Sequence, residues 1–424
     1  MKKMALVGLA LAVAAGSAKA DNEDFVYISL PDIHEVHKLD LQTGVMTLFT
    51  EGIQNPLYFE IGADGCAYVG DFGLGAIWKV YPDGSKELLS YQGLLGAPLT
   101  VAIHPVTGDL YVTDAMYQRI VIVDPVTGDQ TSFSENSDHG LFYVPGGLTW
   151  GRDGNIYMTD HGTHHIIRIY PDGTAEKLID GPAAGFQVPA GIEADHCGNL
   201  FVCLYINGKI VRVREENGEW EVFCDSPLLH WPNDIEIAPN GGLFCANEAG
   251  QRLVHVDSLG QASLVHQDNS VGGWLGVAVP GEHPDVMGGM TELGVGTAGK
   301  DGFVPRLRGL FDPSPGMELG YVIDHAAPST GGLLLYGLEQ SAYDVWGGTL
   351  WVDFSAYWGW IPFQTSAGPS GQGEKRFRFN HPDGPALEGA EFVMQAVLFD
   401  SGNPYNKSMT NGLAVKFGLD PNPD

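Results

Sequence analysis

Acidic and amide side chains recur at matching places along this chain, and they are the residues best suited to chemistry. One set stands at the ends of successive short apolar segments: Asp71, Asp114, Asp160 and Asn247. A further pair, Asn233 and Asp234, directly follows Pro232, and His164 follows the third aspartate. Oxygen atoms that converge from several segments can hold a hard cation such as Ca²⁺ or hydrogen-bond an organic ligand. These residues are therefore the candidate binding residues, and the sequence identifies no catalytic residue.

A motif of about 44 residues, repeated five times between residues 55 and 265, must position these side chains. Each copy has an opening proline, a short apolar segment, a Gly-containing turn, a second apolar segment and a third one rich in Ile, Leu and Val. Repeats of this length, made of short alternating strands, are typical of a β-propeller in which each copy forms one blade. The opening prolines are Pro56, Pro98, Pro145, Pro189 and Pro232.

The two ends of the repeat region complement each other. Residues 26–50 carry only the second, third and fourth strands of a copy, whereas an isolated first strand stands at residues 273–280. Pairing these strands would close the ring and remove two open sheet edges. We therefore predict an all-β fold with a six-bladed β-propeller over residues 25–280, closed by strands from both ends of the ring.

The propeller pattern also predicts which face carries function. The first strand of a blade lines the central channel, and the turns that follow it need glycine for structural reasons. The two residues after each opening proline should form an inner ring, which here is mostly apolar or small, as at Leu57, Leu99 and Ala190. An outer ring should come from the ends of the second strands, such as Asn247 with Glu248.

The copy from residue 144 to residue 166 resembles an NHL repeat, of the TolB-like propeller superfamily. The residues that carry the resemblance are Pro145-Gly146-Gly147-Leu148, Asp153-Gly154-Asn155, Asp160 and His164. It implies that Asp71, Asp114 and Asp160 hydrogen-bond neighbouring turns and that His164 is a framework residue. His161, His164 and His165 could instead bind a transition metal, but their spacing matches no established zinc motif.

Segment 231–244, which begins Trp231-Pro232-Asn233-Asp234, resembles a blade of the senescence-marker-protein/gluconolactonase family. This resemblance implies a six-bladed hydrolase in which one channel Ca²⁺ polarises a lactone or ester carbonyl. Only Asn233 matches the metal ligands of that family, so we expect no cofactor, and Ca²⁺ at Asn233 only if the hydrolase interpretation holds. A weaker likeness to virginiamycin B lyase lacks the histidine that this family carries after the opening proline.

After Pro280 the repeat stops. Residues 281–304 are Gly-rich and irregular, which predicts a linker. Residues 305–418 hold short strand candidates separated by Gly, Pro and Asp, which predicts an antiparallel β-sandwich domain. Its aromatic residues are interpreted as core rather than as a platform for stacking sugars: Trp346, Trp351, Tyr357, Trp358 and Trp360.

Composition restricts location and partners. Residues 1–20 combine Lys2 and Lys3, an apolar run and Ala18-Lys19-Ala20, which predicts a signal peptide and export to the periplasm, the cell surface or the medium. With 52 acidic against 22 basic residues, the chain has a net charge of −30. Such a charge argues against nucleic-acid partners, and no later segment is apolar enough for membrane insertion. The five cysteines lack metal-ligand spacing and are interpreted as buried apolar residues.

These features favour an exported NHL-type propeller that recognises a small molecule, a glycan or a protein through its loop-rich face, without catalysis. Two alternatives stay open. One is a calcium-dependent lactonase or esterase related to gluconolactonase, and the other is a streptogramin-lyase-like lyase. The motifs of serine hydrolases, nucleotide-binding proteins and dehydrogenases are absent from the sequence.

Overall fold

The computed structural model describes most of the chain between Phe25 and Lys416. The described residues are 25–195, 197–238, 242–270, 273–280, 289–293, 296–298, 303–310, 318–338, 340–345, 348–354, 358–367, 373–380, 391–399 and 407–416. The predicted signal peptide, residues 1–20, lies outside them. Within the described part, no helix is long and apolar enough to cross a membrane. The helices there are short: η1 (Pro31–Ile33), α1 (Asn136–His139) and α2 (Gly181–Ala184).

The repeats fold into four-stranded antiparallel sheets, one sheet for each copy of the motif. Each sheet begins at an opening proline. The first three of these sheets are β4 (Pro56–Ile61), β5 (Ala67–Asp71), β6 (Ala76–Val80) and β7 (Lys86–Tyr91); β8 (Pro98–Ile103), β9 (Leu110–Asp114), β10 (Arg119–Val123) and β11 (Gln130–Glu135); and β12 (Pro145–Trp150), β13 (Ile156–Asp160), β14 (Ile166–Ile169) and β15 (Ala175–Ile179). The next two are β16 (Pro189–Ala194), β17 (Asn199–Leu204), β18 (Lys209–Arg214) and β19 (Trp220–Asp225); and β20 (Pro232–Ile237), β21 (Leu243–Asn247), β22 (Arg252–Val256) and β23 (Ala262–Gln267).

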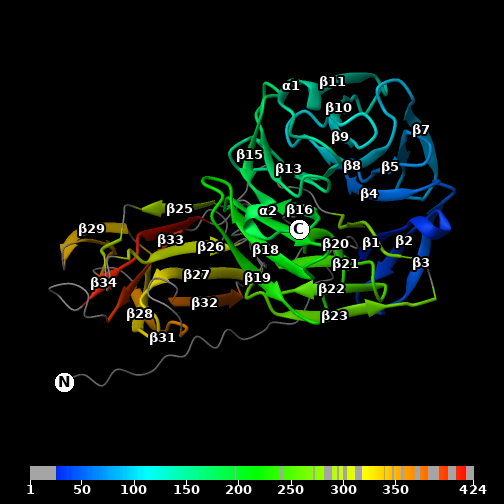
Figure 1. The fold of residues 1–424 in the computed structure, drawn as a ribbon. Helices are drawn as coiled ribbons and strands as arrows, with labels where there is room; N and C mark the ends of the chain where they lie inside the picture. Colours follow the sequence, from blue (N-terminus) through cyan, green and yellow to red (C-terminus); the bar gives the residue numbers. More distant parts are fainter. Residues whose placement is uncertain are drawn as a thin grey trace.

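A sixth four-stranded sheet combines both ends of the repeat region. Its order is β24 (Val277–Ala278), β1 (Phe25–Leu30), β2 (Glu35–Asp40) and β3 (Met46–Glu51). Tyr27 pairs with Ala278 and Ile28 with Val277, so the predicted closing pair of strands is confirmed. The first strands then contact one another in the closed order β4, β8, β12, β16, β20, β24 and back to β4 (Figure 1).

Buried apolar clusters lie between neighbouring sheets all around this ring. One joins Phe201 and Cys203 of one sheet to Ile235 and Cys245 of the next. Another joins Ile28 to Phe244 across the closing point. All five cysteines are free, and four of them are buried, as expected for small apolar residues. The core is therefore distributed between sheets, and the first strands are left to line the channel.

The C-terminal strands form a second unit beside β18 and β19 (Figure 1). A larger sheet has the order β25-β35-β33-β28-β31, with β34 paired to β33, and a smaller one has the order β26-β27-β32. Leu334 and Met394 of the larger sheet share one buried cluster with Leu307, Tyr321 and Phe377 of the smaller sheet. The strands are β25 (Gly289–Leu293), β26 (Arg306–Leu310), β27 (Glu318–Ala326), β28 (Gly331–Gly337), β29 (Gln340–Val345), β30 (Gly348–Val352), β31 (Trp358–Gln364), β32 (Gly373–Asn380), β33 (Glu391–Leu398), β34 (Ser408–Met409) and β35 (Gly412–Lys416).

Two expectations for this region need correction. Strand β25 falls inside the range predicted as a linker, yet it pairs with β35 from Gly289 to Leu293, so these residues belong to the C-terminal sheet. Trp358 and Trp360 were interpreted as core, but they are 42% and 49% exposed, because alternate residues of the edge strand β31 point outward. Trp346 and Tyr357 lie outside the described residues.

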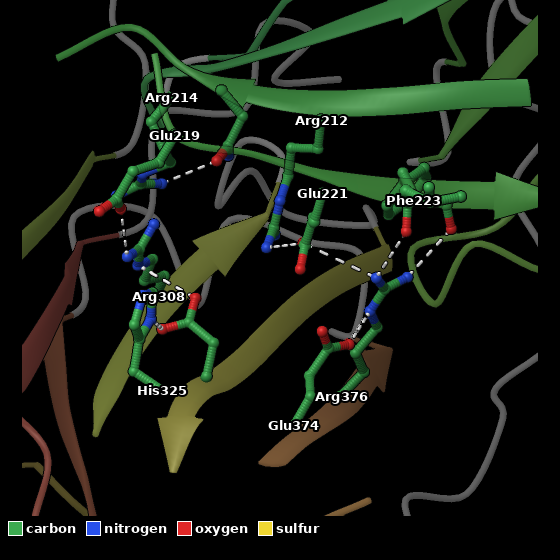
Figure 2. Close-up of polar contacts among 12 residues, drawn as sticks. Arg212, Arg214, Glu219, Glu221, Phe223, Arg308, His325, Glu374 and Arg376 are labelled. Carbon is green, nitrogen blue, oxygen red and sulfur yellow. Dashed lines mark hydrogen bonds and ion pairs between the residues drawn. The ribbon is translucent and has the colours of Figure 1, made fainter. Parts of the chain in front are cut away.

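Arginines fix the C-terminal unit to the propeller (Figure 2). Arg376 of β32 donates to the carbonyl oxygens of Phe223 and Leu259, at 3.1 and 3.0 Å, and its Nε lies 2.5 Å from Glu374 Oε1. Arg308 of β26 donates to Oε2 of Glu219, the residue directly before β19, at 3.3 Å. These contacts join strands that are far apart in the sequence and hold the two units together.

Candidate functional site

A cavity opens at the mouth of the propeller channel, where the first strands begin. Its volume is about 220 Å³. Half of its lining residues directly follow the opening prolines, which is where the inner ring was predicted. The lining residues are Leu57, Tyr58, Leu99, His161, Val188, Ala190, Tyr205, Asn233, Glu248 and Leu275.

A repeated irregularity of the first strands aims these side chains at the cavity. In β4 the pairing with β5 shifts between Pro56 and Phe59, and the first strands β8, β12, β16 and β20 shift directly after their prolines too. Such a bulge bends the strand and redirects its side chains. Gly191 lets β16 approach β20 closely, because a Cβ at this position would lie 2.7 Å from Asp234 Cα.

A chain of polar contacts crosses the apolar wall. Tyr58 donates from its hydroxyl to Asn233 Oδ1, and burial raises the pKa of Tyr58 well above its usual value, so the hydroxyl stays a donor. Asn233 Nδ2 lies 3.5 Å from Glu248 Oε2, which also accepts from the Tyr205 hydroxyl at 2.7 Å. Among the described residues, no group donates a hydrogen bond to Glu248 Oε1. Glu248 Oε1 is thus an acceptor that is free for a ligand.

His161 forms part of the wall without adding charge. Burial lowers the pKa of His161 to about 4, so its ring is neutral near pH 7. Its Nε2 is buried and lacks a partner among the described residues. This atom faces the backbone of Gly146, where a Cβ would lie 2.4 Å from it. His161 therefore acts as a packing residue of the cavity wall.

The predicted aspartates hold the loops of the blades. Asp160 accepts from the backbone amides of Tyr143 and Val144 at 2.8 and 2.9 Å, and from those of Gly162 and Thr163 at 3.0 and 2.7 Å. This is the framework role that the NHL resemblance implies. Three other predicted site residues are equally buried and bind backbone amides in the same way: Asp71, Asp114 and Asn247.

His164 is also part of the framework. Its Nδ1 accepts from the backbone amide of Val188 at 3.2 Å, and its φ of +64° places it in a left-handed turn. Of the seven candidate binding residues, the cavity contains only Asn233, because the others bind backbone amides or face the channel further in. The cavity wall also contains Leu57, Leu99 and Ala190 of the predicted inner ring and Glu248 of the predicted outer ring.

Asp234 and three glutamates face the channel below the cavity. Asp234 Oδ2 accepts from the amide of Val277 at 2.9 Å, and burial raises the pKa of Asp234 to about 7. Burial also raises the pKa of Glu60 to about 8. Burial, together with the charges of the other channel carboxyls, raises the pKa values of Glu193 and Glu236 well above their usual range. The channel therefore holds several carboxyl groups that keep protons near neutral pH.

Sequence reasoning missed these glutamates, although they carry a signal. Glu60, Glu193 and Glu236 each stand four residues after an opening proline. Alternation along a strand, interrupted by the bulge, turns this position toward the channel. Even so, among the described residues no three His, Cys, Asp or Glu side chains are grouped so that they could hold a metal ion.

A second cavity, of about 330 Å³, lies between β18–β19 and the C-terminal strands. Its charged residues are paired with one another: Arg212 with Glu221, and Arg308 with both Glu219 and Asp324. Figure 2 shows that the Arg308–Glu219 pair crosses the boundary between the units, whereas Arg212 and Glu221 belong to neighbouring strands of the propeller. This cavity has a structural character, in contrast to the free acceptor at the channel mouth.

Comparisons with known proteins support the fold. No family model matches the chain. A strictosidine synthase-like protein 13 of Arabidopsis thaliana is 26% identical over 185 residues, which are 39% of this chain and 43% of that protein. Peptidyl-glycine alpha-amidating monooxygenase B of Xenopus laevis is 26% identical over 160 residues, which are 35% of this chain and 17% of that protein. The chain thus spans less than half the length of these curated relatives.

A chain of the crystal structure of a nidogen/laminin complex aligns with a TM-score of 0.52 at 16% identity, over 60% of this chain and 97% of that one. The chain is a β-propeller protein. Virginiamycin B lyase from Staphylococcus aureus aligns with a TM-score of 0.46 at 19% identity, over 58% of this chain and 82% of that one. Likeness at this level carries no argument about activity, so function must come from the cavity.

Proposed function

We propose that this propeller recognises a small organic molecule in the cavity at its channel mouth and does not convert it chemically. The observation that carries the proposal is the cavity itself, whose largely apolar wall includes a carboxylate oxygen, Glu248 Oε1, that no donor among the described residues satisfies. Ligand sites are typically concave and apolar, with few polar groups that orient the ligand. A volume of about 220 Å³ suits a ligand smaller than most drugs.

The lining residues favour binding over catalysis. They include no serine, cysteine or threonine that could act as a nucleophile, and His161 is held neutral against backbone. The wall also gives little support to a calcium-dependent hydrolase, because Leu57, Leu99 and Ala190 occupy places where oxygen ligands are needed. The oxygen of Asn233 is already used by Tyr58.

The proposal includes a ring of six blades, followed by a β-sandwich. The six four-stranded sheets and the closing pairs of β1 with β24 support the ring. The two C-terminal sheets with a shared core support the sandwich. We also propose export on the basis of residues 1–20, so that the ligand would be met in the periplasm, at the cell surface or in the medium.

A cavity-filling variant tests the proposal. Ala190 is 1% exposed in the structure and lines the cavity, so Ala190→Phe should fill it. We expect benzyl alcohol to give saturable binding to the wild-type protein in ligand-observed NMR, and we expect that binding to disappear in Ala190→Phe. Ala183→Phe, outside the cavity in helix α2, serves as a control for non-specific binding. Equal binding to all three proteins would refute the proposed site.

A further inference from the structure

The charges around the channel-mouth cavity are one-sided. Among its lining residues, Glu248 is the only acidic side chain, and neither arginine nor lysine is present. His161 does not compensate, because burial lowers its pKa to about 4. Glu248 is partly exposed, and the described residues place only the Tyr205 hydroxyl and the Asn233 amide near its carboxylate. Within the part of the chain that the structure describes, the carboxylate therefore has hydrogen-bond partners but no cationic partner.

Aromatic rings stand beside this carboxylate. Tyr205 donates to Glu248 and is stacked on Trp231, with 5.7 Å between the ring centroids. The backbone amide of Glu248 donates to the carbonyl oxygen of Trp231 at 3.1 Å, which holds the backbones of these two residues together. Trp231 is 43% exposed and adopts a φ of +53°, a conformation that a bulky residue rarely takes. Aromatic faces attract organic cations, and a nearby carboxylate adds to that attraction.

The charge of the whole protein also favours a cationic ligand. The whole chain has a net charge of −30. A field of this sign draws cations toward a cleft and repels anions. A metal ion would not fit as well as an organic cation, because most of the cavity wall is carbon and only Asn233 and Glu248 offer amide or carboxylate oxygens.

We infer that the ligand of this cavity is a small organic cation, with its ammonium group at Glu248 and its apolar part against Leu57, Leu99 and Ala190. This inference rests on the proposed function and specifies the ligand class for the same site. The ammonium group would donate to Glu248 Oε1, and Tyr205 with Trp231 would supply the aromatic surface.

Three ligands of matched size test the charge. Benzylammonium, benzyl alcohol and benzoate share one ring and differ in the charged group. We expect benzylammonium to bind the wild-type protein roughly tenfold or more tightly than benzyl alcohol, because a hydrogen bond to a charged group is worth more than a neutral one. Benzoate should not bind. The advantage of benzylammonium should shrink as ionic strength rises.

Glu248→Gln separates the ligand class from the site. In this variant we expect the preference for benzylammonium over benzyl alcohol to be lost, because the glutamine amide oxygen can still accept a hydrogen bond but carries no charge. An unchanged melting temperature checks that the variant is folded. Glu216→Gln, an exposed residue outside the cavity, should leave the preference unchanged. If the wild-type protein binds benzyl alcohol as well as benzylammonium, or if Glu248→Gln keeps the preference, the cation inference is wrong while the binding site stands. If none of the three ligands binds, the proposed function fails with it.

Discussion

The propeller channel and the boundary with the C-terminal unit both contain carboxyl groups, but they treat them in opposite ways. Burial raises the pKa of Glu60 in the channel to about 8, and among the described residues no arginine or lysine is a cause that opposes it. At the boundary, burial also acts on Asp324, but the hydrogen bond from His325 and the charge of Arg308 hold the pKa of Asp324 below its usual value. The difference is the supply of cations, because five of the ten arginines of the chain lie at the boundary: Arg212, Arg214, Arg306, Arg308 and Arg376.

This contrast separates charged groups that stabilise the structure from polar groups that are available to a ligand. Charges that are paired within the protein fix its parts relative to each other, and they leave little capacity for a ligand. An acceptor without a partner beside an apolar wall can still form a hydrogen bond or an ion pair with a ligand. The boundary is therefore an ionic connection between two units, whereas the channel mouth is the candidate binding site.

The largest expected effect comes from breaking the connection. Arg376→Met removes a guanidinium that donates to the carbonyl oxygens of Phe223 and Leu259 and pairs with Glu374. Because its side chain is only 15% exposed, the stranded partners would stay largely buried. We expect the free energy of unfolding to fall by about 2–4 kcal/mol in urea titrations. Arg306→Gln, at a 45% exposed pair of 3.7 Å, should cost less than about 0.5 kcal/mol, and an equal loss in both variants would contradict the contrast.

A smaller effect should follow from pH in the channel. A carboxyl group whose pKa is raised by folding contributes stability that is fully present below its unfolded pKa and is lost as pH rises through its folded pKa. For Glu60 the window runs from about 4.5 to about 8, so the protein should lose stability as pH rises through this range. The slope for one such group is at most about 1.4 kcal/mol per pH unit, and less here because Glu60 is partly exposed.

Glu60→Gln measures this contribution directly. At pH 9 the variant should be more stable than the wild-type protein, and at pH 4 the difference should shrink, as followed by urea unfolding at both pH values. The exposed Glu216→Gln variant should show no such dependence. Parallel pH profiles for all three proteins would mean that Glu60 does not keep its proton in the folded state.

The sequence predicted the repeated fold much better than the chemistry of the channel. The opening prolines and the isolated strand at residues 273–280 were sufficient to predict that the last strand of the ring pairs with the first, because strand alternation and repeat length are local signals. The structure adds the register, in which Tyr27 pairs with Ala278. Asn233 was identified as a candidate for the same reason, because it directly follows the opening proline Pro232 of a repeat copy. The role of Glu248 was not, because it depends on Tyr205 of another sheet. The anchoring of Arg376 to Phe223 joins residues 153 positions apart, and no local pattern encodes it.

The smallest expected effect is that of a chelator, and it refines the assignment of the channel mouth. A calcium site needs roughly six or more oxygen ligands, of which water can supply only some without loss of affinity. Here Asn233 Oδ1 accepts from Tyr58, and Leu57, Leu99 and Ala190 fill neighbouring places in the wall. A bound ion would raise the melting temperature in proportion to ln(1 + [L]/Kd), so its removal would be plain. We expect the melting temperature to stay within about a degree or two when a chelator is added. A clear drop that Asn233→Ala abolishes would restore the calcium-dependent hydrolase, whereas a drop that survives Asn233→Ala would place the ion elsewhere on this acidic protein.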